Sequence, residues 1–221
     1  YNVRFAEVEF KPLPFEEDIK LFKGKVVLTP ALYKKLTAEV KMRAFSVSGM
    51  LEADVLLDIY NEVLRGLESG IAFPEFKKAL MPKVAEAWGG KAPYRLDTIF
   101  RTNIQSMYQA GHYKQQMEVV DERPYWQYVA VMDSRTRPSH AAMNGKVFPA
   151  DDPFWEKNYP PNGFNCRCTV RTLSGREMGR DNLTVSKKSQ DIADHGFDFN
   201  PGKAYEPDIS KYPEWLREKM S

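Results

Sequence analysis

A long proline-free stretch with apolar residues at helical spacing is the feature that most constrains the fold. From Pro93 to about Glu122 no further proline occurs, in a chain of 221 residues that has 15 prolines. Apolar side chains recur along this stretch at helical spacing: Phe100, Ile104, Met107 and Tyr108. Such spacing places one apolar stripe on one face of a helix. The sequence therefore predicts a long helix here, the longest in the chain, with its stripe packed in the core.

Three shorter helices are predicted before it. The Thr29-Pro30 pair is typical of a helix start, because threonine caps the first turn and proline lacks an N–H that would need a partner there. Apolar residues then recur about every four positions, and glycines interrupt the pattern. The helices predicted in this way cover about 30–40, 51–69 and 74–88. Pro82 lies inside the third helix and is expected to kink or split it.

The pattern changes after Arg123-Pro124. Aromatic and β-branched residues over 125–132 predict a strand that is buried mainly on one face, and 146–148 and 166–171 are predicted as two further strands. The loop over 149–163 has four prolines but also large aromatic residues, so we expect it to pack against the domain. The predicted fold is α+β: a helical N-terminal part, one long central helix, a small antiparallel sheet with a proline-rich loop, and an extended C-terminal arm.

The same patterns divide the chain into three regions. An N-terminal arm and helix cover residues 1–48, a core covers 49–175, and a C-terminal arm covers 176–221. The arm is polar and shows little periodicity until a short amphipathic segment around 212–220. We expect the arm to become ordered by packing on another surface.

Composition excludes several classes of protein. No stretch approaches the ~18 uncharged apolar residues of a transmembrane helix, and residues 1–20 show no signal-peptide pattern. The 32 Lys and Arg against 30 Asp and Glu give a net charge of +2, too small to predict tight nucleic-acid binding through the overall field. Only two cysteines are present, which excludes a disulfide scaffold and fits a reducing cytosol.

A metal site is one interpretation of the few residues that can carry chemistry. Cys166 and Cys168, with His140 and Asp133, are the four conceivable ligands of a zinc ion. A regular strand holds the Cα atoms of residues i and i+2 about 6.5 Å apart, so a shared ion needs a bent chain there. The alternative is two buried thiols and a hydrogen-bonded histidine. A Cys166–Cys168 disulfide is disfavoured, because its short ring would be strained.

Enzyme interpretations have less support. A catalytic effector, nuclease-like or transferase-like, could use His140, Cys166 and Cys168 only if a thiolate were activated and oriented. The chain has no P-loop, no G-x-G-x-x-G after a strand, no H-E-x-x-H and no G-x-S-x-G. We therefore expect no enzyme and keep the catalytic effector as the alternative.

A local basic stretch is the strongest indication of nucleic-acid contact. Residues 165–190 hold six Lys and Arg against two Asp and Glu. Arginines at this spacing can contact phosphates without reading bases, and the candidates are Arg167, Arg171, Arg176 and Arg180. A solvated basic face is the alternative.

Four motifs in order resemble one known family. They cover residues 133–140, 144–148, 152–155 and 160–168. Together they are similar to the phage Mu F-like minor head proteins, which are head morphogenesis proteins of tailed double-stranded DNA phages and prophages. The segments 100–111 and 14–25 resemble the parts of these proteins that precede the cluster, so the likeness covers most of residues 12–175 and is weak or absent in the last forty-odd residues.

The resemblance implies a structural virion protein, present in a few copies in the head and assembled in the host cytoplasm. It implies action at the portal vertex, with a part in DNA packaging or ejection. The implied partners are the portal protein, the major capsid or scaffold protein, and DNA held weakly and without sequence specificity; no membrane is implied.

The resemblance also bears on the metal site. Many relatives carry a Cys-x-x-Cys pair where this chain has Arg137 and His140, and a later histidine where it has Gly163. In those relatives four cysteines look like a zinc site. Here a structural zinc ion would be held by His140, Cys166 and Cys168 with Asp133. Alternatively, Arg137 braces the cluster by hydrogen bonds to a carbonyl group, without an ion.

Overall fold

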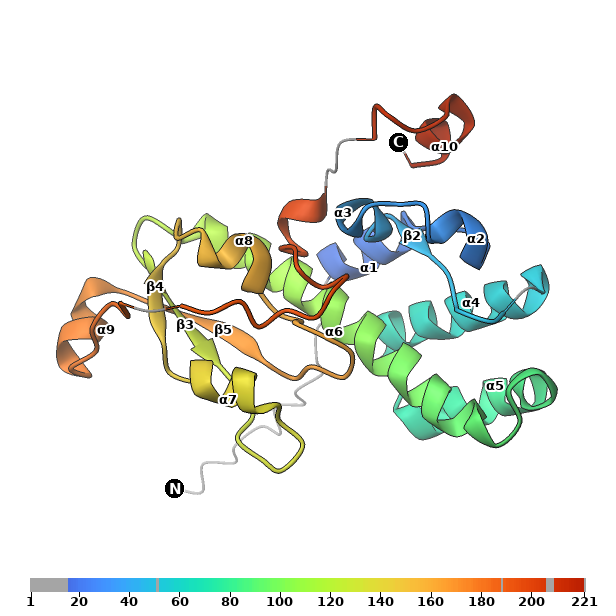
Figure 1. Cartoon of the computed structure of the whole chain (residues 1–221), viewed down its shortest axis with the longest axis horizontal. Coiled ribbons are helices and arrows are strands. Elements are labelled where there is room, and N and C mark those ends of the chain that lie inside the picture. The colour runs from blue at the N-terminus through green and yellow to red at the C-terminus, as the bar shows by residue number, and fades with distance from the viewer. Residues whose placement is uncertain (1–15, 51, 188, 206–208, 221) are drawn as a thin grey trace, which may run out of the picture.

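The structure is a computed structural model that describes residues 16–50, 52–187, 189–205 and 209–220. The predicted N-terminal arm up to residue 15 lies outside the described residues. Figure 1 shows a helical half on the right and a small sheet with its covering helices on the left. The long helix α6 (Ala92–Glu118) runs from one half into the other. This arrangement confirms the predicted α+β fold.

The helical half is built on three helices that the apolar spacing predicted. They are α4 (Ala53–Ser69), α5 (Phe73–Trp88) and α6, with a short 3-10 turn, η1 (Gly89–Lys91), joining the last two. Leu56, Ile59 and Val63 of α4 are buried in the core of this half. Gly70 ends α4 with a left-handed φ of 62°, a conformation that glycine adopts without steric penalty. The helix α5 continues through Pro82 as one element rather than splitting there.

The predicted helix over 30–40 is wrong in one respect. The structure has two short helices in its place, α2 (Pro30–Tyr33) and α3 (Ala38–Lys41). Thr37 between them adopts an extended backbone (ψ 162°), which ends the helical path. Leu36 is buried beside the C-terminal helix while Leu32 is exposed, so the four-residue spacing reflects tertiary packing and not one continuous helix.

Short elements complete the helical half. The helix α1 (Glu16–Lys23) leads into β1 (Val26–Val27), which pairs in parallel with β2 (Ala44–Phe45). The side chain of Phe22 stacks on Tyr60 of α4, with ring centroids 4.9 Å apart. This packing attaches α1 and the two-stranded sheet to the main helices.

The second half contains a three-stranded antiparallel sheet in the order β4-β3-β5. Its strands are β3 (Tyr125–Val129), β4 (Val147–Pro149) and β5 (Thr169–Leu173). Trp126 of the central strand pairs with Phe148 on one side and with Thr172 on the other. Along β3 buried and partly buried residues alternate, which confirms a strand with one buried face. The prediction that the third strand begins at the cysteines is wrong, because β5 begins only at Thr169.

The proline-rich loop packs as expected. It contains the helix α8 (Phe154–Asn158) and contributes Phe154, Trp155 and Tyr159 to an aromatic core around Trp126. The indole Nε1 of Trp155 donates to the Pro149 carbonyl at 2.9 Å. The loop is therefore part of the folded core. The helix α7 (Pro138–Met143) lies between β3 and β4 in sequence.

The C-terminal arm is extended and packs on the same chain. It begins with α9 (Gly175–Arg180), contains a 3-10 turn, η2 (Lys203–Tyr205), and ends with α10 (Glu214–Met220). Ile192 belongs to the core of the sheet half, whereas Ala204 belongs to the helical core. Figure 1 shows this segment crossing from the sheet half to the helices, with α10 on the side of α2 and α3. The described part of the arm thus packs on the chain's own surface.

Within the described residues, no helix combines the length and the apolar character needed to cross a bilayer.

Candidate metal centre

The helix α7 supplies the histidine of the site. Arg137 precedes it with an extended backbone, and Pro138 occupies the first turn, where its missing N–H is no loss. His140 follows on the buried face, and only 2% of it is exposed. The short helix therefore directs the imidazole into the core of the sheet half.

A turn before β5 supplies the two cysteines. Asn165 adopts a left-handed φ of 57°, and the Cys166 N–H donates to the Gly163 carbonyl at 3.2 Å. Because of this turn, Cys166 and Cys168 do not lie in a regular strand. The chain has the bend that a shared ion would need.

The three side chains converge in one place. Nδ1 of His140 lies 3.7 Å from Sγ of Cys166 and 3.5 Å from Sγ of Cys168. All three donor atoms lie within 4.8 Å of one another, and the three residues are buried. Both cysteines are free. Residues separated by up to 28 positions thus form one buried cluster.

This geometry fits a tetrahedral zinc ion. Zinc bonds of about 2.1 Å to nitrogen and about 2.3 Å to sulfur place a nitrogen and a sulfur ligand about 3.6 Å apart. The two N···S distances, 3.7 and 3.5 Å, agree with that value. Two sulfurs and one imidazole are also the donor types that zinc prefers. The cluster provides three protein ligands and leaves the fourth position to another group.

The two thiols are electrostatically unequal. A hydrogen bond with Cys168 lowers the pKa of Cys166, and the same contact together with burial raises the pKa of Cys168. Contact with His140 and backbone N–H groups lowers the pKa of Cys166 further. Cys166 is therefore the thiol that ionises first. A bound metal ion would require both sulfurs as thiolates.

Asp133 does not join the cluster. Its carboxylate accepts two hydrogen bonds from the guanidinium of Arg167, at 2.6 and 2.7 Å. This paired geometry lowers the pKa of Asp133. Among the described residues, the group of donors close enough to share an ion contains His140, Cys166 and Cys168 only.

Arg137 forms the contact that the alternative interpretation predicted. Its Nη2 donates to the Phe164 carbonyl at 3.2 Å and to Oδ2 of Asp194 at 3.0 Å. The guanidinium therefore ties the cysteine turn to the C-terminal arm. The Arg137 brace and the His140, Cys166 and Cys168 cluster are both present in the structure.

Sequence reasoning missed several polar residues around the turn. Gln105 and Gln109 of α6 both donate to the Cys168 carbonyl, at 3.0 and 3.3 Å. Asn162 is fully buried, and its amide donates to Tyr128 Oη at 3.1 Å. Burial strongly raises the pKa of Tyr128, so its hydroxyl stays neutral. The glutamines at i and i+4 on the predicted long helix are a signal that could have revealed this anchoring face.

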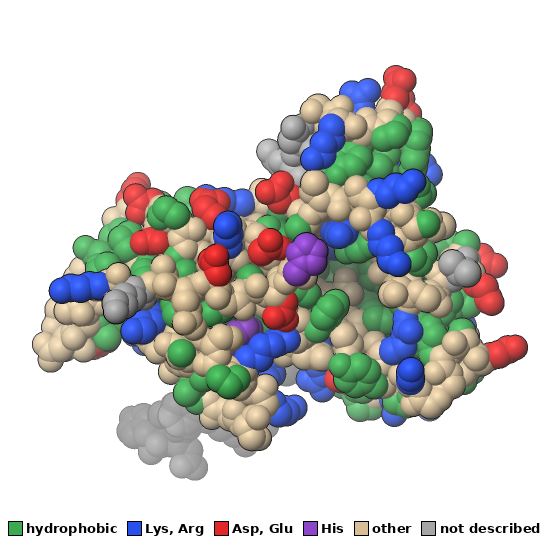
Figure 2. Space-filling view, viewed as in Figure 1, with side chains coloured by type: hydrophobic (Ala, Val, Ile, Leu, Met, Phe, Trp, Pro, Cys, Tyr) green, Lys and Arg blue, Asp and Glu red, His purple; other side chains and the backbone are tan. Residues whose placement is uncertain are grey.

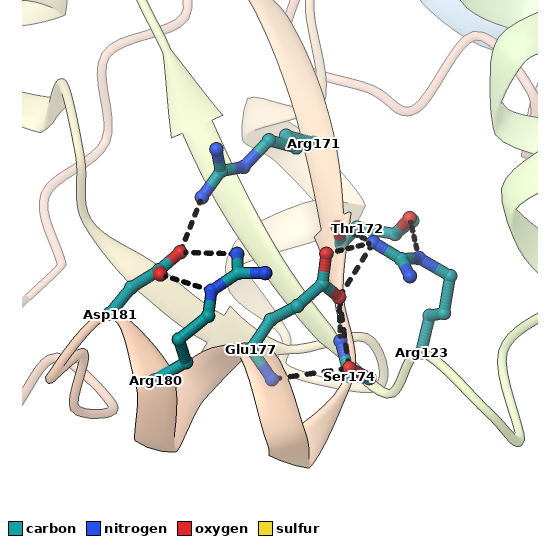
Figure 3. A network of polar contacts seen from close by, with 7 residues as sticks. All are labelled: Arg123, Arg171, Thr172, Ser174, Glu177, Arg180 and Asp181. Carbon is teal, nitrogen blue, oxygen red and sulfur yellow. Dashed lines mark hydrogen bonds and ion pairs between the residues drawn. The ribbon is translucent and has the colours of Figure 1, made fainter.

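The four predicted phosphate-contacting arginines occupy different environments. Arg167 pairs with Asp133, as described above. Arg180 pairs with Asp181 at 2.7 Å, and Arg171 lies 4.0 Å from the same carboxylate, as Figure 3 shows. Arg176 is exposed on α9. Three of the four thus have a carboxylate nearby, and nucleic-acid contact through them stays a prediction.

The molecule is an α+β protein in which a buried His-Cys-Cys cluster follows one long helix. The model of the Phage Mu protein F like family matches residues 57–171, a little over half of the chain. The chain belongs to this family.

Two relatives of this chain come from a phage and a prophage. The protein named capsid assembly protein F of Escherichia phage Mu is 42% identical over 192 residues, which are 79% of this chain and 44% of that protein. The Mu-like prophage FluMu F protein of Haemophilus influenzae is 41% identical over 186 residues, 76% of this chain and 45% of that protein. The chain thus spans less than half the length of these relatives. An uncharacterized protein of Methanocaldococcus jannaschii is 32% identical over 119 residues, 52% of this chain and 16% of that protein. No solved structure gives a significant match.

Proposed function

We propose that this chain is a structural protein of a phage or prophage head, acting in head morphogenesis at the portal vertex. The observation that carries the proposal is its 42% identity, over 79% of its length, to a protein named for capsid assembly. Through this role it takes part in DNA packaging or ejection, and it resides in the virion after assembly in the host cytoplasm. The portal protein is the proposed main partner, and the major capsid or scaffold protein a further one.

We further propose that the His140, Cys166 and Cys168 cluster binds zinc in a structural role. The ion would join α7 to the turn before β5, two segments that no strand pairing connects directly. Burial of all three ligands supports a structural ion, since a substrate would need access to it. Accordingly, we expect no catalytic activity from the cluster.

Co-purification with the portal protein tests the proposed function. The full chain is expressed with the portal protein of its own phage or prophage, and the complex is isolated at a series of salt concentrations. Retention at high salt is expected, because an apolar interface is little affected by screening. Absence of the chain from purified heads would contradict the proposal. Salt-sensitive association with DNA but none with the portal protein would also contradict it.

A further inference from the structure

A groove of about 510 Å³ lies where the helical half meets the sheet half. Its walls come from the segment 25–48, from one face of α6, from the cysteine turn and from residues 195–201 of the arm. Figure 2 shows this face hollowed, with apolar side chains at the floor and blue Lys and Arg side chains along its right-hand rim. A volume of this size is typical of a ligand site.

The charge of the groove differs from that of the whole chain. Positive side chains and one histidine line it: Lys25, Lys34, Lys41, Arg95 and His195. Among the described residues that form its wall, none is Asp or Glu. The chain overall is almost balanced, with 32 basic and 30 acidic residues. The groove therefore concentrates positive charge and would attract an anionic partner.

Lys25 is the most unusual of these cations, because it is only 9% exposed. Its ammonium lies 5.8 Å from the centroid of the Phe22 ring, and within the described part of the chain no carboxylate forms an ion pair with it. Burial and the charge of Arg43 lower the pKa of Lys25 to about 7. A buried ammonium without a counter-ion is unfavourable. An arriving carboxylate would form an ion pair with Lys25.

Exposed aromatic side chains also line the groove. Tyr94 is 69% exposed and Phe164 is 59% exposed. The Phe164 ring meets Phe197 edge to face, with centroids 5.0 Å apart. Aromatic side chains in this setting are typical anchors of a protein–protein contact.

We propose that this groove binds an acidic peptide segment of a partner protein, with one carboxylate on Lys25 and an apolar side chain against Tyr94 and Phe164. A peptide is favoured over a nucleic acid because the central cation is buried. A carboxylate at the end of a flexible side chain can reach the buried Lys25. The phosphates of a nucleic-acid duplex, in contrast, lie on the broad outer surface of the duplex. The inference stands on the groove's own geometry and does not depend on the proposed role in head assembly.

Peptide binding to the full chain tests this inference. Two fluorescein-labelled peptides of about twelve residues are compared by anisotropy: one has Glu and Asp around Leu and Phe, and the other has Gln and Asn in place of the acids. The acidic peptide is expected to bind saturably, at least about tenfold more tightly than the neutral one. Equal binding of the two peptides, or no saturable binding of the acidic one, would overturn the proposal.

Variants locate the peptide. Lys25→Met keeps most of the aliphatic stem and removes the charge, and it is expected to weaken binding at least about tenfold. Lys78→Met makes the same change at an exposed position of α5 outside the groove and should leave binding unchanged. Tyr94→Ala affects an exposed side chain and provides a second test should Lys25→Met fail to fold. The assignment to an acidic peptide would be overturned if Tyr94→Ala and folded Lys25→Met both bound the peptide with unchanged affinity. Displacement of the peptide by single-stranded oligo(dT) would overturn it as well.

Discussion

The hydroxyl of Tyr159 donates a hydrogen bond to Oε1 of Gln116 at 2.8 Å, and both residues are buried. The amide of the same glutamine donates to the Val170 carbonyl at 2.8 Å. Gln116 belongs to α6, Tyr159 to the proline-rich loop and Val170 to β5. One side chain of the long helix thus joins two segments of the sheet half.

Replacing Tyr159 by phenylalanine should therefore be destabilising. The variant keeps the ring but leaves Oε1 of Gln116 buried without its donor, which costs about 1–3 kcal/mol. Urea denaturation followed by tryptophan fluorescence measures the difference. The control is Tyr94→Phe, which removes the same hydroxyl from a side chain that is 69% exposed. Equal stability of the two variants would show that the buried contact contributes nothing.

The sequence predicts well those elements whose apolar spacing is regular. The helices α4, α5 and α6 appear close to the expected bounds because their buried residues repeat at helical period over several turns. The strand β3 follows from alternating aromatic residues but ends at Val129 rather than at residue 132. A regular apolar pattern predicts an element well, because the positions that face the core recur at the same spacing along it.

Two parts of the chain were harder to predict for identifiable reasons. The segment 30–41 keeps its apolar spacing across a break at Thr37, because α10 covers it from a distant part of the sequence. The turn before β5 depends on the left-handed Asn165 and on glutamines of α6 that hold the Cys168 carbonyl. The sequence identified His140, Cys166 and Cys168 as candidates, but not that Asp133 pairs with Arg167.

Metal analysis tests the cluster directly. Protein purified without chelator is expected to contain about one zinc ion per chain, as measured by elemental mass spectrometry. The variants Cys166→Ser and Cys168→Ser should lose this zinc. Asp133→Asn serves as the matched control, because it alters a nearby acid whose oxygens bind Arg167, and zinc content should not change. Zinc-free wild-type protein with undiminished thermal stability would contradict the proposal.

A close approach at Gly202 gives a packing prediction. A Cβ atom at this position would overlap the Tyr113 ring. Gly202→Ala should therefore displace the arm from α6 and destabilise the chain by about 1–3 kcal/mol. Gly179→Ala is the matched control, because nothing lies within 4 Å of its added carbon. Limited proteolysis should cut the arm of the first variant faster; identical digestion patterns would argue against the contact.

The polar network in Figure 3 predicts an acid-sensitive contribution to stability. Glu177 accepts from the Ser174 N–H at 2.8 Å and from Arg123 at 2.8 Å, and these contacts lower the pKa of its carboxyl from 4.5 to about 2. A lowered carboxyl pKa stabilises the fold fully above about pH 4.5, and the effect is lost as the pH falls toward 2. The stability difference between wild type and Glu177→Gln should therefore shrink over this range.

Denaturation curves at several pH values measure that difference. Glu86→Gln provides the control, because Glu86 is exposed on α5 and away from the network. A gap between wild type and Glu177→Gln that stays constant from neutral pH to about pH 2.5 would count against the ion pair and the cap as its source.

The path of the C-terminal arm has a consequence for how the chain is made. Ile192, Ala204 and Leu216 belong to three different cores, so each core gains part of its cover from residues late in the sequence. On the ribosome, residues before 189 emerge first, and their apolar surfaces stay open until the arm follows. Translation of the arm therefore adds cover to the three cores one after another, in the order Ile192, Ala204 and Leu216. Release of the nascent chain before the arm is made would leave apolar surface exposed in both halves of the molecule.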